Sequence, residues 1–240
     1  MSKLYIIGTP IGNLKDITFR AVETLNKVDI IACEDTRVTT KLLEHFSITK
    51  KTLITNNAFN ENATAKIILN YLQAQKNVGL VSDAGMPVVS DPGFSIINLA
   101  RNNGYDIEII PGVSAVTTAF VGSGFSNNFT FLGFIKDKSQ QRKNQLTNLS
   151  EGTYIFFISP HKLLQTIKDI YNVFNDNVNI CLAKELTKIY EQWFFDKPSV
   201  LITKFQNIEK IKGEYTLVIN IPKTKHIKVN KYPKINKNIV

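Results

Sequence analysis

The amino-acid sequence predicts an α/β protein with two domains, and three observations support this. Short apolar and β-branched runs alternate with segments of helical periodicity through the first half of the chain. Several of these runs end in glycine, proline or an acid, as strands of open parallel sheets do where they bind ligands. The second half is richer in strand-like runs. We expect a doubly wound domain over residues 1–120, a mixed α/β domain over 121–222 and a basic tail over 223–240.

The composition is that of a folded protein of a reducing compartment. The chain has 240 residues, of which 43% are hydrophobic, and its two cysteines, Cys33 and Cys181, are far apart in the sequence. The apolar run after Lys3 is too short for a secretion signal, and glycine, proline and asparagine interrupt the uncharged stretch between Glu108 and Lys136. We therefore expect a cytoplasmic protein without a membrane span.

The net charge is concentrated near the end of the sequence. Residues 222–240 carry six lysines and no acid, against a formal net charge of +9 for the whole chain. A basic tail on a nearly balanced body favours an anionic partner, and RNA is the partner we expect. The alternative is a compositional bias, because the whole chain is rich in lysine, asparagine and isoleucine.

The first predicted strand, Leu4–Ile7, ends in a turn-rich loop over Gly8–Leu14. This loop has neither the third glycine of the dinucleotide fingerprint nor the Gly-Lys-Ser/Thr ending of a phosphate-binding loop, so NAD and ATP are not supported. Apolar residues at helical spacing then predict a helix over 17–28.

The second predicted strand, Ile30–Cys33, ends in the charged cluster Glu34–Arg37. Because carboxyl ends of parallel strands meet at one edge, this cluster should lie on the same rim as the acid that follows the strand at Val78–Val81. A structural interpretation stays open here, in which Asp35 caps the next helix and Arg37 pairs with a neighbouring acid.

The rest of the first domain is organised around the loop 82–93. A strand at 52–55 and a helix around 67–72 lead to the strand before this loop, where Asp83 and Gly85 are placed to hold a polar ligand. The alternative is that Asp83 and Asp91 only turn the chain, with Asp91 as the N-cap of a helix through residue 100.

A further strand, Ile107–Ile110, reaches the turn Pro111–Ala115, which opens a helix of small residues. A helix amino terminus has free N–H groups, and small side chains let a ligand approach them. This turn is therefore a third candidate element of the binding rim.

The second half contains six strand-like runs and one clear amphipathic helix, which extends to Phe174. Residues 136–143 form a predicted polar loop with four basic side chains. His161 is a candidate general base, although a lone histidine beside a helix start is more often a helix cap or an ordinary surface residue. The predicted strands are Phe129–Phe134, Tyr154–Ile158, Ile180–Ala183, Tyr190–Phe195, Val200–Thr203 and Thr216–Ile221.

The candidate site has acids and glycines but no recognisable nucleophile or metal ligand set. The histidines His45, His161 and His226 are scattered without metal-binding spacing, and the sequence has no G-x-S-x-G elbow. This pattern favours a cosubstrate that carries its own reactive group, and no metal.

Six motifs follow one another along the chain: Leu4–Leu14 (LYIIGTPIGNL), Cys33–Arg37 (CEDTR), Leu80–Gly93 (LVSDAGMPVVSDPG), Pro111–Ala115 (PGVSA), Ala183–Lys188 (AKELTK) and Lys212–Ile219 (KGEYTLVI). In this order they resemble those of the bacterial 16S ribosomal RNA cytidine 2′-O-methyltransferases, a branch of the tetrapyrrole methylase superfamily. Two departures concern the substrate side: many relatives have threonine in place of Met86, and Glu-Ser-Pro-His-Arg in place of residues 158–162. Many relatives also continue beyond the point where this sequence stops.

The resemblance implies two α/β domains of the tetrapyrrole methylase type, with S-adenosyl-L-methionine (SAM) in the cleft between them. It further implies a homodimer that methylates the ribose 2′-oxygen of a cytidine in the decoding centre of 16S rRNA, with free rRNA or the small ribosomal subunit as substrate. Carried over by position, the SAM-binding residues are Pro10, Asp83, Gly85, Met86, Ser114, Ala115, Ile158, Ala183 and Thr216.

The proton of the ribose hydroxyl needs an acceptor, and the resemblance places Lys184 and Glu185 near the cleft as candidates. Two other functions remain open: a tetrapyrrole (precorrin-type) C-methyltransferase, and a non-catalytic RNA-binding relative. The basic residues that we expect to contact RNA phosphates are Arg37, Arg142, Lys143, Lys162 and Lys188.

Overall fold

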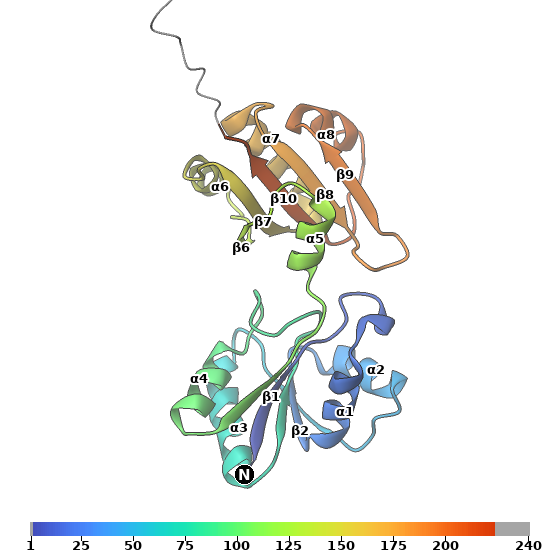
Figure 1. Ribbon diagram of the computed structural model, residues 1–240, viewed down its shortest axis with the longest axis vertical. Helices are drawn as coiled ribbons and strands as arrows, with labels where there is room; N and C mark the ends of the chain where they lie inside the picture. Colours follow the sequence, from blue (N-terminus) through green and yellow to red (C-terminus); the bar gives the residue numbers. More distant parts are fainter. Residues whose placement is uncertain (1, 224–240) are drawn as a thin grey trace, which may run out of the picture.

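The computed structural model describes residues 2–223, which form two lobes, each built on a five-stranded sheet (Figure 1). The predicted α/β class is confirmed. Residues 224–240 lie outside the described part of the chain, so the predicted basic tail stays a prediction from the sequence. Among residues 2–223, no helix combines the length and apolar character needed to cross a bilayer.

The sheet of the first lobe is parallel throughout, with strand order β3-β2-β4-β1-β5. Its three inner strands are almost wholly apolar, as expected where helices cover both faces of a sheet. The carboxyl ends of its strands meet at the edge that faces the second lobe (Figure 1). The strands are β1 (Lys3–Ile7), β2 (Ile30–Cys33), β3 (Thr52–Thr55), β4 (Val78–Leu80) and β5 (Asp106–Ile110).

Two helices cover each face of this sheet (Figure 1). Helices α1 (Phe19–Lys27) and α2 (Thr36–His45) bury apolar residues in one core cluster. Helices α3 (Glu61–Gln73) and α4 (Phe94–Asn102) bury theirs in a second cluster on the opposite face. A short 3-10 helix, η1 (Leu14–Asp16), lies in the first loop. This arrangement is the doubly wound architecture that the alternating pattern predicts.

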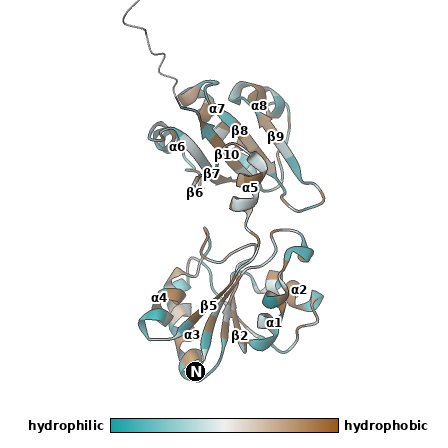
Figure 2. Cartoon of the chain, viewed as in Figure 1, coloured by the Kyte–Doolittle hydropathy of each residue, from teal (hydrophilic) through white to brown (hydrophobic). Residues whose placement is uncertain are grey.

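The second lobe has a mixed sheet with strand order β6-β7-β10-β8-β9. Only β6 and β7 run parallel, and the other neighbouring strands pair antiparallel. In Figure 2 hydrophobic colour runs along the inner strands of this sheet. The strands are β6 (Thr130–Phe134), β7 (Gly152–Ile158), β8 (Asn179–Lys184), β9 (Gln192–Asp196) and β10 (Tyr215–Ile221).

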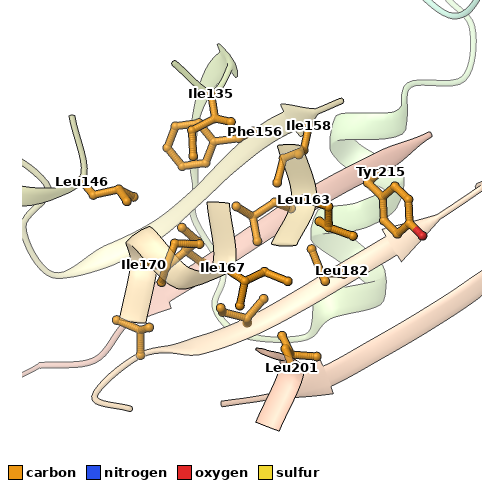
Figure 3. Packing of buried hydrophobic residues seen from close by; sticks show 14 of the residues in the cluster. Ile135, Leu146, Phe156, Ile158, Leu163, Ile167, Ile170, Leu182, Leu201 and Tyr215 are labelled. Atoms are coloured by element: carbon orange, nitrogen blue, oxygen red, sulfur yellow. The ribbon is translucent and has the colours of Figure 1, made fainter. Parts of the chain in front are cut away.

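One face of the second sheet is covered by α6 (Ser139–Thr147), α7 (Leu163–Phe174) and α8 (Pro198–Phe205), with η2 (Pro160–Lys162) before α7. In Figure 3 the labelled α7 side chains point onto the sheet. They belong to a cluster of buried residues that fixes the lobe as one packing unit.

Helix α5 (Ala115–Ser123) follows the crossing between the lobes and packs on the other face of the second sheet. Its Val116 and Ala119 share a core cluster with Ile155 of β7 and Val218 of β10. Helix α5 therefore packs as part of the second lobe. The domain boundary predicted at residue 120 falls within this helix.

Two predicted elements of the second half differ from the structure. Residues 200–203, predicted as a strand, lie in α8, whose first turn is set by Pro198. The polar loop predicted over 136–143 becomes helical from Ser139.

The predicted cap of α4 also differs. The N-cap is Gly93 rather than Asp91. The Glu61 carboxylate, from α3, accepts the N–H groups of Gly93 at 3.0 Å and Ser95 at 2.7 Å. The first turn of α4 is therefore satisfied from a neighbouring helix, and Asp91 does not serve it.

Candidate active site

The two loops that follow β1 and β4 are hydrogen-bonded to each other at the rim of the first sheet. The Thr9 N–H donates to the Gly85 carbonyl at 2.9 Å, and the Gly85 N–H donates to the Thr9 carbonyl at 3.1 Å. The Thr9 hydroxyl also donates to the Ser82 carbonyl at 3.1 Å. Gly85 has a φ of +84°, a left-handed conformation that favours glycine. This pairing fixes the backbone on either side of Asp83.

A second close approach joins the end of β1 to the turn before α5. A Cβ atom added to Gly112 would lie 2.9 Å from the Cα of Gly8, which is closer than real Cβ contacts. Both positions therefore require glycine for steric reasons. The consequence is that Ser114 and Ala115, at the amino terminus of α5, are held beside the first loop.

Three acids follow β2 and β4 on this rim. Asp83 Oδ1 accepts the backbone N–H of Asp35 at 3.0 Å, while Asp35 itself caps α2 and forms a 2.6 Å ion pair with Arg37. The structural interpretation of Asp35 and Arg37 is thus confirmed. Burial raises the pKa of Asp83, although the Asp35 N–H opposes the change. Burial, together with the charges of Asp83 and Asp35, raises the pKa of Glu34.

Asp91 is a fourth acid of the rim, on the loop between β4 and α4. Burial, and then the negative charge of Glu34, raise the pKa of Asp91 to about 6, against a smaller opposing effect of the Ser82 hydroxyl. Its loop is strained, because Val88 and Ser90 have φ values of 72° and 71°. Strain of this kind persists where surrounding structure imposes it, often at functional sites.

The edge of the second sheet that faces this rim brings together the ends of β7 and β8 and the start of β10. Tyr215 pairs with Ile158 on one side and with Lys184 on the other, so these three strand ends are level. The lobes touch through loops, since the Asn13 N–H donates to the Thr187 hydroxyl at 3.1 Å.

A cavity of about 340 Å³ lies between the lobes, within the range typical of small-molecule sites. Eight of the nine residues predicted to bind a cosubstrate line it. The exception is Pro10, which is buried in the first loop. The eight are Asp83, Gly85, Met86, Ser114, Ala115, Ile158, Ala183 and Thr216.

The cavity has further lining residues that were not predicted as binding residues, and two of them, Phe134 and Phe157, lie outside all six sequence motifs. Phe134 and Phe157 belong to a sheet that is rich in aromatic residues. From the sequence alone they look like ordinary core or edge residues, because only the alignment of the strands places them beside the cavity. Asp91 is visible in the sequence, but its acid-proline-glycine setting predicts a helix start. The further residues that line the cavity include Ile11, Asp91, Phe134, Phe157, Leu186 and Glu214.

Lys184 and Glu185, predicted as proton acceptors, are not among the residues that line this cavity. Glu185 Oε1 accepts the Glu214 N–H at 2.8 Å and the Lys188 ammonium at 3.1 Å. Burial alone would raise the pKa of Glu185, but these two partners outweigh it and the net pKa is lowered. The geometry therefore does not support the predicted catalytic role. Instead, the Glu185 side chain links the loop after β8 to the turn before β10 by hydrogen bonds.

Arg142, predicted to contact RNA, is buried, with 1% of its surface exposed. Its guanidinium pairs with Asp169 at 2.6 Å and donates to the carbonyls of Lys136 at 2.8 Å and Asp137 at 3.1 Å. It therefore has no access to an RNA phosphate, and its predicted role is wrong. The other four predicted contacts keep solvent-exposed surface, each next to an acid: Arg37, Lys143, Lys162 and Lys188.

The described residues contain no cluster of three or more histidine, cysteine or acidic side chains arranged to hold a metal ion. Both cysteines are buried, and burial raises the pKa of the Cys181 thiol to about 12 and that of Cys33 as well. Neither thiol is therefore poised as a nucleophile. The arrangement suits the binding of a cationic small molecule between acids and an apolar second lobe.

Comparison with known proteins agrees with this arrangement. A protein from Mycoplasmopsis pulmonis named ribosomal RNA small subunit methyltransferase I is 50% identical over 222 residues, covering 92% of this chain and 99% of its own. One of the same name from Thermotoga maritima is 42% identical, with the same coverage. The solved uroporphyrin-III C-methyltransferase of Thermus thermophilus complexed with S-adenyl homocysteine matches with a TM-score of 0.65 at 12% identity, over 91% of this chain and 97% of that one. The profile of the tetrapyrrole (corrin/porphyrin) methylases matches residues 3–197, and this chain belongs to that family.

Proposed function

We propose that this protein transfers a methyl group from SAM to small-subunit ribosomal RNA, at the ribose 2′-oxygen of a cytidine in the decoding centre. The observation that carries the proposal is the inter-lobe cavity, which gathers eight of the nine residues that the motif resemblance assigns to SAM. The names and the 40–50% identity of the curated relatives support rRNA as the substrate.

The residues of the cavity fit SAM chemically. Asp83 lines it from the first lobe and would stabilise the positive charge of its amino group. The Ser114 side chain makes no capping hydrogen bond to α5, so within the described chain the first N–H groups of this nine-residue helix can receive a carboxylate. Ile158 and Ala183 offer an apolar surface for a nucleoside. When bound, SAM supplies an activated methyl group, and the transfer requires no metal.

The mouth of the cavity has features that suit single-stranded RNA. Phe134 lines the cavity yet is 61% exposed, and an exposed aromatic ring can stack on an unpaired base. Lys136 and Lys138 follow it and are exposed, so basic side chains lie close to the ring in the sequence. Lysines of the tail would add a sequence-independent attraction for phosphates.

We further propose a homodimer in the cytoplasm, as the family resemblance implies. The second lobe exposes apolar side chains on α5 and around β9, with Val121 77%, Ile189 95% and Phe195 48% exposed. Exposed apolar surface of this kind often marks a protein interface. Sedimentation velocity at micromolar concentration should give twice the monomer mass, and a monomer at that concentration would rule the dimer out.

The function is tested with methyl-labelled SAM and small ribosomal subunits from a bacterium that lacks the modification. Label should enter the rRNA of the subunits, and purified free rRNA should be compared in parallel. A tetrapyrrole substrate such as uroporphyrinogen III serves as the competing acceptor. Label on the tetrapyrrole but not on rRNA would overturn the proposal in favour of a C-methyltransferase. Binding of RNA without methyl transfer would make this a non-catalytic relative.

A further inference from the structure

Four titratable side chains line the cavity, from Asp83, Asp91, Glu214 and Tyr215. Asp83 accepts the Asp35 N–H and is proposed to hold the cosubstrate. Glu214 forms a 2.9 Å ion pair with Lys188 at the surface. Tyr215 is 4% exposed and packs in the core of the second lobe. Three of the four groups thus have other roles, and Asp91 remains.

The Asp91 carboxylate has no assigned structural role. The amino terminus of α4, where the sequence pattern predicts Asp91 as a cap, is served by Glu61 from α3. Among the ion pairs of residues 2–223, none involves Asp91; the neighbouring charges that act on it are the negative ones of Glu34 and Asp83, and the Ser82 hydroxyl is its polar partner. A half-buried acid held without a cation on a strained loop costs stability, so a functional reason for its position is expected.

Asp91 also lies in the part of the chain that approaches the exposed Phe134 of the second lobe. The residue before it, Ser90, lies close to the backbone of β6 beside Phe134, since a Cβ on Gly133 would lie 3.4 Å from the Ser90 hydroxyl. Phe134 and Asp91 line the same cavity from the two lobes. A nucleotide whose base stacks on Phe134 would therefore bring its ribose towards Asp91.

We propose that Asp91 is a catalytic residue, the group that accepts the proton of the ribose 2′-hydroxyl during methyl transfer. This inference rests on the proposed function. The 2′-oxygen forms the new bond to the methyl carbon as the carbon–sulfur bond breaks, and the electron pair of that bond stays on sulfur. The hydroxyl proton goes to the Asp91 carboxylate. The products are a methyl ether, a neutral thioether and a protonated Asp91.

The electrostatics of the site support this role. Burial and the neighbouring charges of Glu34 and Asp83, which follow β2 and β4, make the Asp91 carboxylate more basic than an ordinary aspartate. With a pKa of about 6, it is still mostly ionised at neutral pH. A general base works best when its pKa lies close to the working pH, and such catalysis contributes about 10²- to 10⁴-fold to rate.

The test is Asp91→Asn, compared with Asp91→Glu and with the control Asp106→Asn, which removes an exposed acid at the opposite end of the first sheet. We expect kcat with saturating SAM and small subunits to fall by about 10²-fold or more in Asp91→Asn. Affinity for S-adenosylhomocysteine, measured by calorimetry, should change by less than about threefold, because proton transfer is not part of binding. Asp91→Glu should recover part of kcat, because it keeps a carboxylate.

Two pH measurements distinguish catalysis from a structural role. The kcat of the wild-type protein should rise with pH through an apparent pKa near 6, and Asp91→Asn should lose this limb. Because the folded-state pKa of Asp91 is raised, wild-type stability should fall as pH rises from about 4 to above 6. Asp91→Asn should lack that component and melt at the same or a higher temperature than wild type at pH 8.

The outcomes separate the inference from the proposed function. A wild-type protein that transfers no methyl group to rRNA would refute the proposed function. An active wild type with an Asp91→Asn variant of equal kcat and unchanged pH profile would refute only the Asp91 assignment. If Asp91→Asn does not fold, the same comparison is made with Asp91→Ala, and the wild-type pH profile stands by itself. The inference is then overturned if Asp91→Ala has the same kcat as the wild type. It is also overturned if the kcat of the wild type does not rise with pH near pH 6.

Discussion

The Asp83 carboxylate accepts a hydrogen bond of 3.0 Å from the backbone N–H of Asp35, which links the carboxyl ends of the neighbouring strands β4 and β2. The bond occupies Oδ1, and because Asp83 also lines the cavity, its second oxygen can serve a ligand there. The charge of Asp83 lies beside further acids, so the rim attracts cations. Substitutions at this position should therefore affect ligand binding more than folding.

Asp83→Asn is expected to weaken SAM binding by about tenfold or more, since a charged hydrogen bond is worth roughly 1.5–3 kcal/mol. The amide oxygen can still accept the Asp35 N–H. Because the pKa of Asp83 is raised in the folded protein, its ionised form does not stabilise the fold at neutral pH, and the melting temperature should not fall. Calorimetry and a thermal melt decide, with Asp106→Asn as control. Wild-type affinity, or a collapsed melting transition, would refute the assignment.

Glu185→Gln is expected to lower the free energy of unfolding by about 1–2 kcal/mol at pH 7, because it weakens the hydrogen bonds to Lys188 and to the Glu214 N–H. The folded-state pKa of Glu185 is lowered, so its contribution exists above the unfolded value of about 4.3 and is lost as pH falls through the folded value. Urea titrations at pH 7 and below pH 4 should thus differ, with Glu209→Gln as control. Equal losses of unfolding free energy at both pH values would contradict this stabilising role of the Glu185 carboxylate.

Arg142→Met is expected to destabilise the protein by about 3–5 kcal/mol, because it removes the 2.6 Å charge partner of the buried Asp169 and leaves only the more distant Lys143 at 3.8 Å. The double variant Arg142→Met/Asp169→Leu should lose less than the single variant, since apolar replacement of a whole buried pair is often tolerated. A double-mutant cycle in urea measures the coupling. If the losses of unfolding free energy were additive, Arg142 and Asp169 would not be coupled, which would contradict the ion pair. The salt dependence of RNA binding by the folded double variant should match wild type, as the buried arginine meets no phosphate.

The fold of the first lobe could be predicted closely because its strands are short apolar runs that end in turn formers. Strands Ile30–Cys33 and Thr52–Thr55 have the predicted bounds. The run Val200–Thr203 is wrongly predicted as a strand because four apolar or β-branched residues suit a strand and a buried helix equally, and Pro198 is the informative signal. Periodicity gives elements reliably where their flanks are informative.

The candidate site could be predicted as a rim but not as a complete cavity. Motifs placed acids, glycines and a helix start together, because these follow strand ends. The second-lobe wall depends on strand alignment, which sequence periodicity does not contain. The same limit explains Arg142: a helix of polar residues buries one guanidinium only because Asp169 of α7 lies opposite, a contact between residues that are 27 apart in the sequence.

Deleting the basic tail, residues 223–240, which carry six lysines, is expected to reduce the salt dependence of RNA binding. Each lost phosphate contact should lower the slope of log affinity against log salt by roughly 0.7–0.9. Affinity for SAM should not change, because the residues that line the described cavity all precede the deletion. Fluorescence anisotropy with a labelled rRNA fragment at several salt concentrations gives the slope. An unaltered slope would assign the lysines of the tail to compositional bias.

The most direct measurement of the central claim locates the methyl group on the RNA. Alkaline cleavage of RNA requires a free 2′-hydroxyl, so a 2′-O-methylated ribose resists it. After incubation of unmodified small subunits with the protein and SAM, the alkaline ladder of 16S rRNA should show one new protected position, at a cytidine of the decoding region. At limiting SAM, Asp83→Asn should give much weaker protection at that position, because it binds SAM less tightly. A labelled methyl group on a base, with no protected position in the ladder, would contradict ribose methylation.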